Sequence, residues 1–137
     1  MSLVLDSSVA LAWAYQDETT AEILEVFARV ATSGAWVTSL WRLEIANVLE
    51  AGVRRGRGTA EFRDATLADL ALLPIRADEE TELHAWGATL QLAGRHKLTV
   101  YDAAYLELAV RRRLPLATLD EQLRAAGNSE GVPLLGR

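Results

Sequence analysis

The sequence contains no cysteine, and only two of its 137 residues are histidines. The absence of cysteine excludes disulfide bonds and thiolate metal sites, and it is typical of proteins of the reducing cytoplasm. His84 and His96 are far apart in the chain, so their spacing does not indicate a pair of imidazoles that binds a metal. We expect both histidines to be surface residues or to be satisfied by hydrogen bonds.

Long apolar stretches and an excess of positive charge are also missing. No apolar run approaches the roughly 20 residues that span a bilayer, and the first residues lack the basic and long apolar segments of a secretory signal. The net charge of −5 argues against broad electrostatic attraction to nucleic acid. Three basic clusters, at 54–57, 95–97 and 111–113, are interpreted as solvated helix ends. We therefore expect a cytoplasmic protein without a membrane segment.

What the sequence does have is apolar residues, which make up 50% of the chain and indicate a folded protein. A length of 137 residues suits one domain with a substantial core. No repeat, linker or low-complexity stretch is visible. We therefore predict a single domain over residues 1–137.

A short apolar run at residues 3–5 organises the predicted fold. Its unbroken apolar character, ended by Asp6, predicts a strand buried on both faces, which belongs in the middle of a sheet. Asp6 then lies at the carboxyl end of that strand, at the edge where open α/β sheets bind ligands. The alternative is that Asp6, Ser7 or Ser8 only caps the following helix.

The rest of the chain alternates between helical and strand patterns. Helices are predicted at 8–15, 20–31, 40–55, 59–72, 78–93, 98–113 and 119–126. Strands are predicted at 36–38, around Ile75, at 114–118 and at 132–135. Because strands alternate with helices, we predict the α/β class, with three α/β/α layers around a central, mostly parallel sheet.

Most of the 19 acidic residues lie on polar faces, but four have apolar surroundings: Asp6, Glu44, Asp102 and Asp120. Asp6 and Asp120 follow predicted strands, and Glu44 and Asp102 lie in or near the first turns of predicted helices. All four can therefore meet at one edge of the sheet. Two unit charges 4 Å apart repel by about 4 kcal/mol at an effective dielectric constant near 20. Convergence therefore requires protonation or a cation, and oxygen-only ligands favour Mg²⁺ or Mn²⁺, the ions of phosphoryl chemistry.

Each acid also has a purely structural explanation. Asp102 can be favoured by a helix dipole, Glu44 can pair with an arginine, and Asp120 or Thr118 can cap the following helix. These explanations treat each acid separately and do not account for the predicted position of all four at the same edge of the sheet. The four tryptophans are interpreted as core or interface residues rather than platforms for stacked bases: Trp13, Trp36, Trp41 and Trp86.

With these acids marked, the sequence resembles the PIN-domain ribonucleases, and within them the VapC toxins of bacterial and archaeal toxin–antitoxin pairs. The resemblance covers nearly the whole chain and rests on four segments in the family's order: 4–8, 44–49, 98–105 and 115–120. It implies a doubly wound α/β/α fold and Mg²⁺- or Mn²⁺-dependent endonucleolytic cleavage of RNA. It also implies a homodimer and a cognate VapB-like antitoxin whose C-terminal segment covers the active-site groove.

The resemblance also assigns roles to residues. The four acids named above match the family's acidic quartet, which holds the metal and its activated water, with Asp6 and Asp102 foremost as direct ligands. Ser7 (or Ser8) and Thr118 match positions whose hydroxyl orients the acids or the water, and Asn47 matches a polar position near the site.

One departure concerns a further acid that some members carry two residues past the fourth one; here that position is Gln122, with Glu121 beside Asp120 instead. RNA affinity in so acidic a chain must come from metals, arginine clusters and a dimer groove rather than from overall charge. Nothing in the sequence indicates which RNA is cut.

Two other functions stay open. One is a phosphatase or phosphoacceptor domain, although a haloacid-dehalogenase-type enzyme requires an acid where Ser8 stands, and a receiver-type domain requires paired acids and a lysine that are not evident. Stable phosphorylation of Asp6 by a small phosphodonor would favour it. The other is a catalytically silent PIN-like module that only binds partners.

Overall fold

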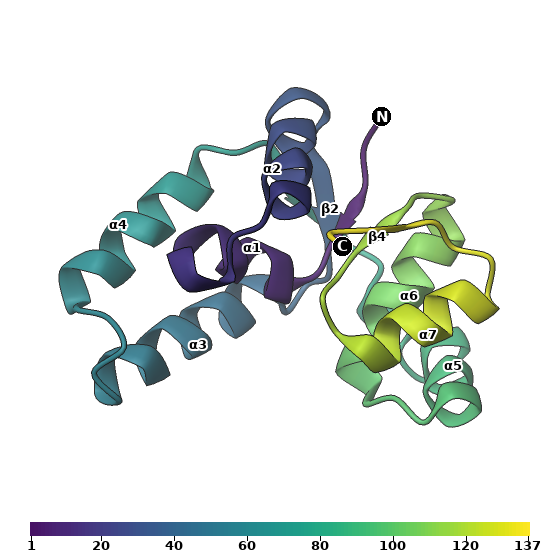
Figure 1. Cartoon of the computed structure of the whole chain (residues 1–137). Coiled ribbons are helices and arrows are strands. Elements are labelled where there is room, and N and C mark those ends of the chain that lie inside the picture. Colours follow the sequence, from purple (N-terminus) through teal and green to yellow (C-terminus); the bar gives the residue numbers. More distant parts are fainter.

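Five short strands form one central sheet in the computed structural model, which describes residues 1–137 (Figure 1). The strands are β1 (Val4–Leu5), β2 (Ala35–Val37), β3 (Ile75–Ala77), β4 (Leu116–Ala117) and β5 (Leu134–Leu135). Their order across the sheet is β3-β2-β1-β4-β5, and every neighbouring pair is parallel. The predicted parallel sheet is confirmed, with β1 in its middle.

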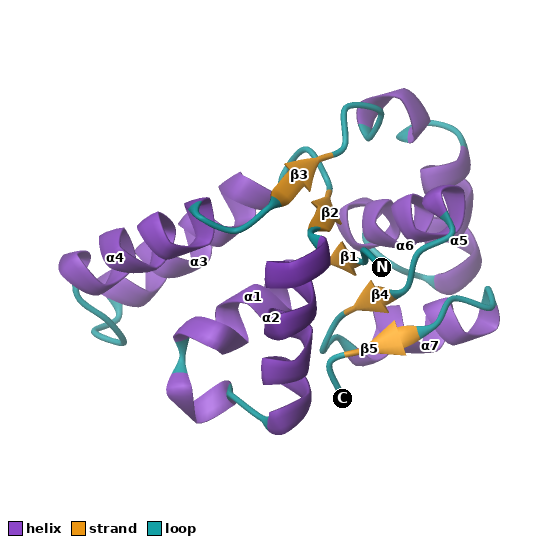
Figure 2. Cartoon of the chain, turned by 90° about the horizontal axis from the view of Figure 1, so that it is seen from above, coloured by secondary structure: helices purple, strands orange, loops and turns teal.

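Helices cover both faces of this sheet (Figure 2). They are α1 (Ser7–Ala14), α2 (Ala21–Ser33), α3 (Trp41–Arg54), α4 (Ala60–Ala71), α5 (Ala88–His96), α6 (Val100–Arg112) and α7 (Glu121–Ser129). The first four lie on one face and the last three on the other. This division follows from right-handed crossovers, because the chain moves outward from β1 to β3 and then returns to β4 on the other side of β1. The predicted three-layer fold is confirmed.

The core confirms the central position of β1. A single cluster of 29 buried apolar residues holds the layers together, and Leu3, Val4 and Leu5 within it have no exposed surface. None of the helices combines the length and the apolar character that crossing a membrane requires.

Threonine caps define where three of the helices begin. The hydroxyls of Thr20, Thr59 and Thr99 accept hydrogen bonds from the amide three residues further on, at 3.2, 3.0 and 3.1 Å. Each cap of this kind stabilises a helix by about 1 kcal/mol. The Thr99 cap fixes the start of α6 and thereby places Asp102 in its first turn.

The helix predicted at 78–93 is wrong in its first half. A short 3₁₀ helix, η2 (Glu82–His84), and turns occupy this segment, and the α-helix begins only at Ala88. Asp78 does not open a helix; its buried carboxylate follows β3 and accepts hydrogen bonds from Arg111 and Thr81. A distant ion pair thus overrides the local preference of acids for helix N-termini.

Arg111 and Arg112 are not the solvated helix end that the sequence indicates. Arg111 contacts the buried carboxylates of Asp78 and Glu107, at 2.7 and 2.8 Å. Arg112 reaches Asp78 at 3.2 Å and lies over the indole of Trp36, 3.6 Å from the ring centroid. Burial alone would raise the pKa of Asp78, but hydrogen bonds from Arg111, Thr81 and Arg112 outweigh it and lower the pKa. This ionic network ties the end of α6 to the sheet.

Candidate acidic site at the carboxyl edge of the sheet

The candidate site lies where the chain changes direction across the sheet. Residues Leu5 of β1 and Ala117 of β4 are paired neighbours, and their connections leave to opposite faces, which makes this edge a topological switch point. Asp6 follows β1 directly, and Asp120 follows β4 after two residues. Glu44 and Asp102 reach the same place from the first turns of α3 and α6.

Asp6 is the most enclosed of the four acids, with 5% of its surface exposed. Its Oδ2 atom accepts two hydrogen bonds, from Ser8 Oγ at 2.6 Å and from Thr118 Oγ1 at 2.7 Å. The side chain makes no helix-capping bond, so capping does not explain it. Burial raises the pKa of Asp6, the two hydroxyls partly counteract this, and the charge of Asp120 raises it further.

Glu44 is held by a tyrosine rather than by an arginine. The Tyr105 hydroxyl donates a hydrogen bond of 2.5 Å to Glu44 Oε1. Burial raises the pKa of Glu44, this hydrogen bond lowers it, and the charges of Asp6 and Asp102 raise it again. Burial and the charges of Asp6 and Glu44 also raise the pKa of Tyr105, so its hydroxyl stays protonated and keeps donating. Tyr105 is a site residue that the sequence analysis did not assign, and its position one turn after Asp102 was the signal available.

Asp102 and Asp120 complete the group. Burial raises the pKa of Asp102, and the charges of Asp6 and Asp120 add to this effect. Asp120 caps α7, because its Oδ1 accepts a hydrogen bond of 2.8 Å from the Leu123 amide. Of the two caps that the sequence allowed, Asp120 is therefore the one used.

The predicted supporting residues differ in how they take part. Thr118 is buried and contacts Asp6, whereas Ser7 makes no side-chain hydrogen bond, and its neighbour Ser8 contacts Asp6 in its place. The Ser8 hydroxyl also accepts from the Leu119 amide at 3.1 Å, which ties the ends of β1 and β4 together. Asn47 is exposed on α3, one turn beyond Glu44.

The charges of the group suit a divalent cation. None of the four carboxylates forms an ion pair within the chain. Burial raises the pKa of Asp6, Glu44 and Asp102, and the charges of neighbouring carboxylates add to this effect. No three acidic or histidine side chains converge, as they stand, closely enough to hold one ion. Mg²⁺ commonly takes only one or two protein carboxylates and fills its other positions with waters and substrate phosphates. The donor set therefore fits such an ion.

An open hollow leads away from the acids on one side. It has a volume of about 380 Å³, and its lining includes Ser8 and Asp120 of the acidic site together with Glu18, Arg55 and Arg57. The Arg57 guanidinium lies over the Tyr15 ring, 4.1 Å from its centroid. We call this cavity the Arg55 hollow. Arg57 pairs with Asp17 and Glu18, at 3.1 and 2.7 Å, so Arg55 is the arginine of this hollow that has no ion pair and can hold a phosphate group.

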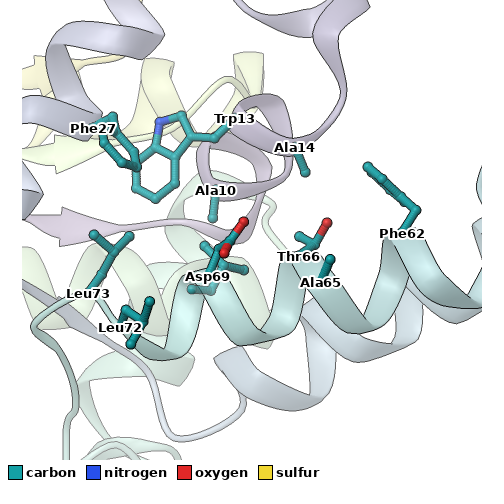
Figure 3. A pocket seen from close by; sticks show the side chains of 11 residues that line it. Ala10, Trp13, Ala14, Phe27, Phe62, Ala65, Thr66, Asp69, Leu72 and Leu73 are labelled. Carbon is teal, nitrogen blue, oxygen red and sulfur yellow. The ribbon is translucent and has the colours of Figure 1, made fainter.

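The largest cavity lies elsewhere and contains none of the four acids. It is an apolar groove of about 550 Å³ between α1 and α2 on one side and α4 on the other (Figure 3). Trp13 and Phe27 meet edge to face, with centroids 5.2 Å apart, and face Leu72 and Leu73 across it. We call it the α1/α4 groove. Its apolar lining suits a peptide helix better than a reaction centre.

Comparison with known proteins adds family information. The family model described as PIN domain matches residues 3–128. No curated protein sequence matches the chain. Among solved structures, PAE2754 from Pyrobaculum aerophilum is similar with a TM-score of 0.65 and 20% identity, covering 92% of this chain and 84% of that one.

Two further structures share the fold. VapBC2 from Rickettsia felis, bound to a DNA fragment from its promoter, has a TM-score of 0.65 at 12% identity, and the match covers 98% of this chain and 97% of that one. FitAcB from Neisseria gonorrhoeae has a TM-score of 0.65 at 14% identity, covering 98% and 96%.

Proposed function

The chain belongs to the PIN domain family, and from this premise we propose that it is a divalent-metal-dependent endoribonuclease, the toxin of a toxin–antitoxin pair. The observation that carries the proposal is the acidic group at the switch point. Four carboxylates lie at this edge of the sheet, close enough for their charges to add to the raised pKa of three of them, and none of them forms an ion pair with a cation of the chain. Such a group is costly unless it binds a metal, and divalent metals perform phosphodiester hydrolysis.

The acids have distinct roles in the proposed mechanism. Asp6 and Asp102 would be the principal ligands of Mg²⁺ or Mn²⁺, with Asp120 and Glu44 completing the acidic set. A bound ion of this kind supplies an activated water and neutralises charge on the phosphate. Ser8 and Thr118 hold the Asp6 carboxylate in place, and Tyr105 does the same for Glu44.

Of the two serines that follow Asp6, we assign the role of orienting its carboxylate to Ser8, because only Ser8 contacts Asp6. Asn47, exposed on the same helix as Glu44, is placed to contact the RNA. The RNA backbone would approach through the Arg55 hollow, where Arg55, which has no ion pair within the chain, can bind a phosphate. This arrangement suits a single-stranded segment, whose backbone can follow a groove of this size.

The antitoxin partner is supported by two of the similar structures. VapBC2 and FitAcB are complexes of a toxin with its antitoxin. In this chain the α1/α4 groove offers an apolar surface of the kind that binds an amphipathic helix. An antitoxin helix placed there would approach the acidic site, because α1 begins beside Asp6. Such a pair would act in the cytoplasm, where the RNA substrate is.

Binding of the antitoxin in the α1/α4 groove can be tested by placing a negative charge in the groove. Leu72 lines the groove and is 84% exposed, so Leu72→Asp should leave the fold intact. A carboxylate facing an apolar helix should weaken the complex with the cognate antitoxin by about tenfold or more, measured as a dissociation constant by calorimetry. The matched control is Leu43→Asp, which is 69% exposed and lies outside the groove. Equal affinity of both variants would place the antitoxin elsewhere.

A homodimer is supported by exposed apolar side chains in one short segment. Leu83 of η2, Trp86 of the following turn and Leu90 of α5 are 75%, 93% and 51% exposed. Large apolar side chains grouped in this way mark association surfaces. We place the dimer contact on this segment.

The activity is tested directly by metal removal. The purified protein, free of antitoxin, is incubated with total RNA and Mg²⁺ or Mn²⁺, and the products are mapped by primer extension or sequencing. Discrete fragments are expected with either ion and should disappear in EDTA, because the acids alone cannot activate water. Fragments that persist in EDTA would contradict the metal mechanism.

The same experiment separates the alternatives. Absence of cleavage with every metal and RNA, combined with no heat of Mg²⁺ or Mn²⁺ binding in calorimetry, would favour a silent binding module. Metal binding without cleavage of total RNA would indicate a narrow substrate absent from the sample.

A further inference from the structure

A second, smaller hollow adjoins the acidic site at Glu44 and shares no lining residue with the Arg55 hollow. It lies between the segment before α3, the η2 turn and the starts of α5 and α6, and Glu44 is part of its wall. Its volume is about 140 Å³, below the roughly 300–1,000 Å³ typical of pockets for drug-sized ligands. This room suits one planar ring system and not a whole nucleotide. We call it the Thr89 hollow.

An unpartnered hydroxyl lies in its wall. Thr89 is 1% exposed and lines the hollow, and its Oγ1 atom has no hydrogen-bond partner. Buried hydroxyls are nearly always hydrogen-bonded, so an orphan of this kind needs an explanation. The neighbouring Thr81 hydroxyl, in contrast, is fully used, donating to Asp78 and accepting from the Ser39 amide. A ligand with a polar edge would supply the partner that Thr89 lacks.

The charges around the hollow exclude a phosphate. Glu44 and Glu82 line it, and no lysine or arginine does. Carboxylates repel phosphate groups but accept hydrogen bonds from amino and ring N–H groups, which nucleobases carry. The Arg55 hollow differs in containing Arg55, which has no ion pair within the chain. Of the two cavities beside the acids, only that one offers a cation to a phosphate, and the Thr89 hollow suits a neutral group with N–H donors.

The mouth of the hollow offers an aromatic surface. Tyr101 lines it, is 62% exposed and directly precedes Asp102. Val100 and Ala104 add apolar wall on the same helix. Exposed aromatic rings beside such walls are the usual means by which proteins hold unstacked bases of single-stranded nucleic acid.

We infer that the Thr89 hollow binds one nucleobase of the RNA, next to the phosphate that is cut. This inference rests on the proposed nuclease function and adds a base-binding subsite to it. The strand would cross the acids with this base inserted beside Glu44 and its backbone continuing toward Arg55. Base preference at that position is then set by Thr89, Glu82 and the size of the hollow.

The test uses free ribonucleosides, because they carry no phosphate and need neither metal nor cleavage. Adenosine, guanosine, cytidine and uridine, with ribose as the sugar control, are titrated into the ¹⁵N-labelled full chain in EDTA. At least one nucleoside should shift the amide signals of Thr89, Tyr101 and Ala104 in a saturable way, and ribose should not. Shifts with ribose alone, or with no nucleoside, would overturn the inference.

Two variants locate the binding. Ala85→Leu fills the hollow and should weaken nucleoside binding by about tenfold or more, the order expected for losing one stacked base. Ala88→Leu, the same change three residues further on and outside the lining, should bind as the parent does. Thr89→Val removes the orphan hydroxyl, should fold without loss of stability, and should alter the ranking of the four nucleosides. Unchanged binding by Ala85→Leu would refute the location.

These outcomes are independent of those for the nuclease. Asp6→Asn should still bind nucleosides, because Asp6 does not line the hollow. Nucleoside binding without any RNA cleavage would contradict the nuclease and retain a base site, whereas cleavage without nucleoside binding would contradict only the base site. If cleavage is found, an abasic residue beside the cut should slow the parent on the order of tenfold and leave Ala85→Leu nearly unaffected.

Discussion

Replacing Asp6 by asparagine is expected to abolish RNA cleavage while the protein remains folded. Even residues that only support metal ligands change affinity or activity by about 10–100-fold, so loss of a principal ligand should exceed a hundredfold. The fold should survive because Ser8 and Thr118 both donate to one oxygen of Asp6, and the amide oxygen of asparagine can accept both bonds. The measurement is the single-turnover rate on a mapped substrate, with the exposed Asp64→Asn as control. A rate close to the parent's would remove Asp6 from the mechanism.

The same substitution has a stability signature that a merely structural aspartate would not show. Because burial raises the pKa of Asp6 in the folded protein, folding favours its protonated form, and the parent loses stability as the pH rises from the ordinary value of 3.8 through the raised one. Asparagine has no such titration, and its presence also lowers the pKa of Glu44 and Asp102 by removing a neighbouring charge. In EDTA the melting temperature of Asp6→Asn should therefore exceed the parent's increasingly with pH.

Added metal should make the parent more stable than Asp6→Asn, the reverse of the order expected in EDTA. A ligand present at 100 times its dissociation constant stabilises the folded state by about 2.7 kcal/mol, and only the parent has the full site. The sign of the difference between parent and variant should thus change when EDTA is replaced by Mn²⁺. A variant that is less stable than the parent in EDTA at neutral pH would contradict the electrostatic account of the site.

Replacing Arg111 by methionine is expected to cost about 3–5 kcal/mol of the free energy of unfolding, the range for breaking a buried ion pair from one side. Arg111 is the partner of Glu107, whose side chain is 6% exposed, and the closest partner of Asp78, whose side chain is fully buried. Methionine preserves much of the aliphatic packing, so the loss reports mainly two buried carboxylates: Glu107 without its cation, and Asp78 with only Arg112 remaining. Urea unfolding followed by circular dichroism gives the value.

Two controls make this prediction specific. Arg54→Met breaks the exposed pair with Glu50 and should cost no more than about 1 kcal/mol. Adding Glu107→Leu to Arg111→Met removes the buried carboxylate that has lost its cation and should recover part of the lost stability. No recovery in the double variant would mean that Arg111 acts through packing instead.

The sequence was informative where function depends on local pattern. The apolar run 3–5 and the acid after it sufficed to place Asp6 at the carboxyl end of a central strand, and the first-turn positions of Glu44 and Asp102 brought them to the same edge. Both conclusions needed only strand burial and the geometry of parallel sheets.

What the sequence left undecided depends on contacts between distant segments. The choice between Ser7 and Ser8 is made by the phase of α1 relative to Asp6, and both serines look alike in the sequence. The bond from Tyr105 to Glu44 joins residues 61 positions apart. Likewise Asp78 had the pattern of a helix-opening acid, and only the packing of α6 against the sheet shows that it pairs with Arg111.

The pairing of β1 with β4 also determines when the protein can become active during its synthesis. Val4 emerges from the ribosome long before Leu116, its partner in the sheet, and the bond from Thr118 to Asp6 spans 112 positions. Contacts of such long sequence separation form late and slow folding. A nascent chain that has not yet reached β4 has Asp6 but neither Thr118 nor Asp120 beside it. For a proposed nuclease made amid the cell's RNA, this topology delays the completed site until β4 and Asp120 have left the ribosome.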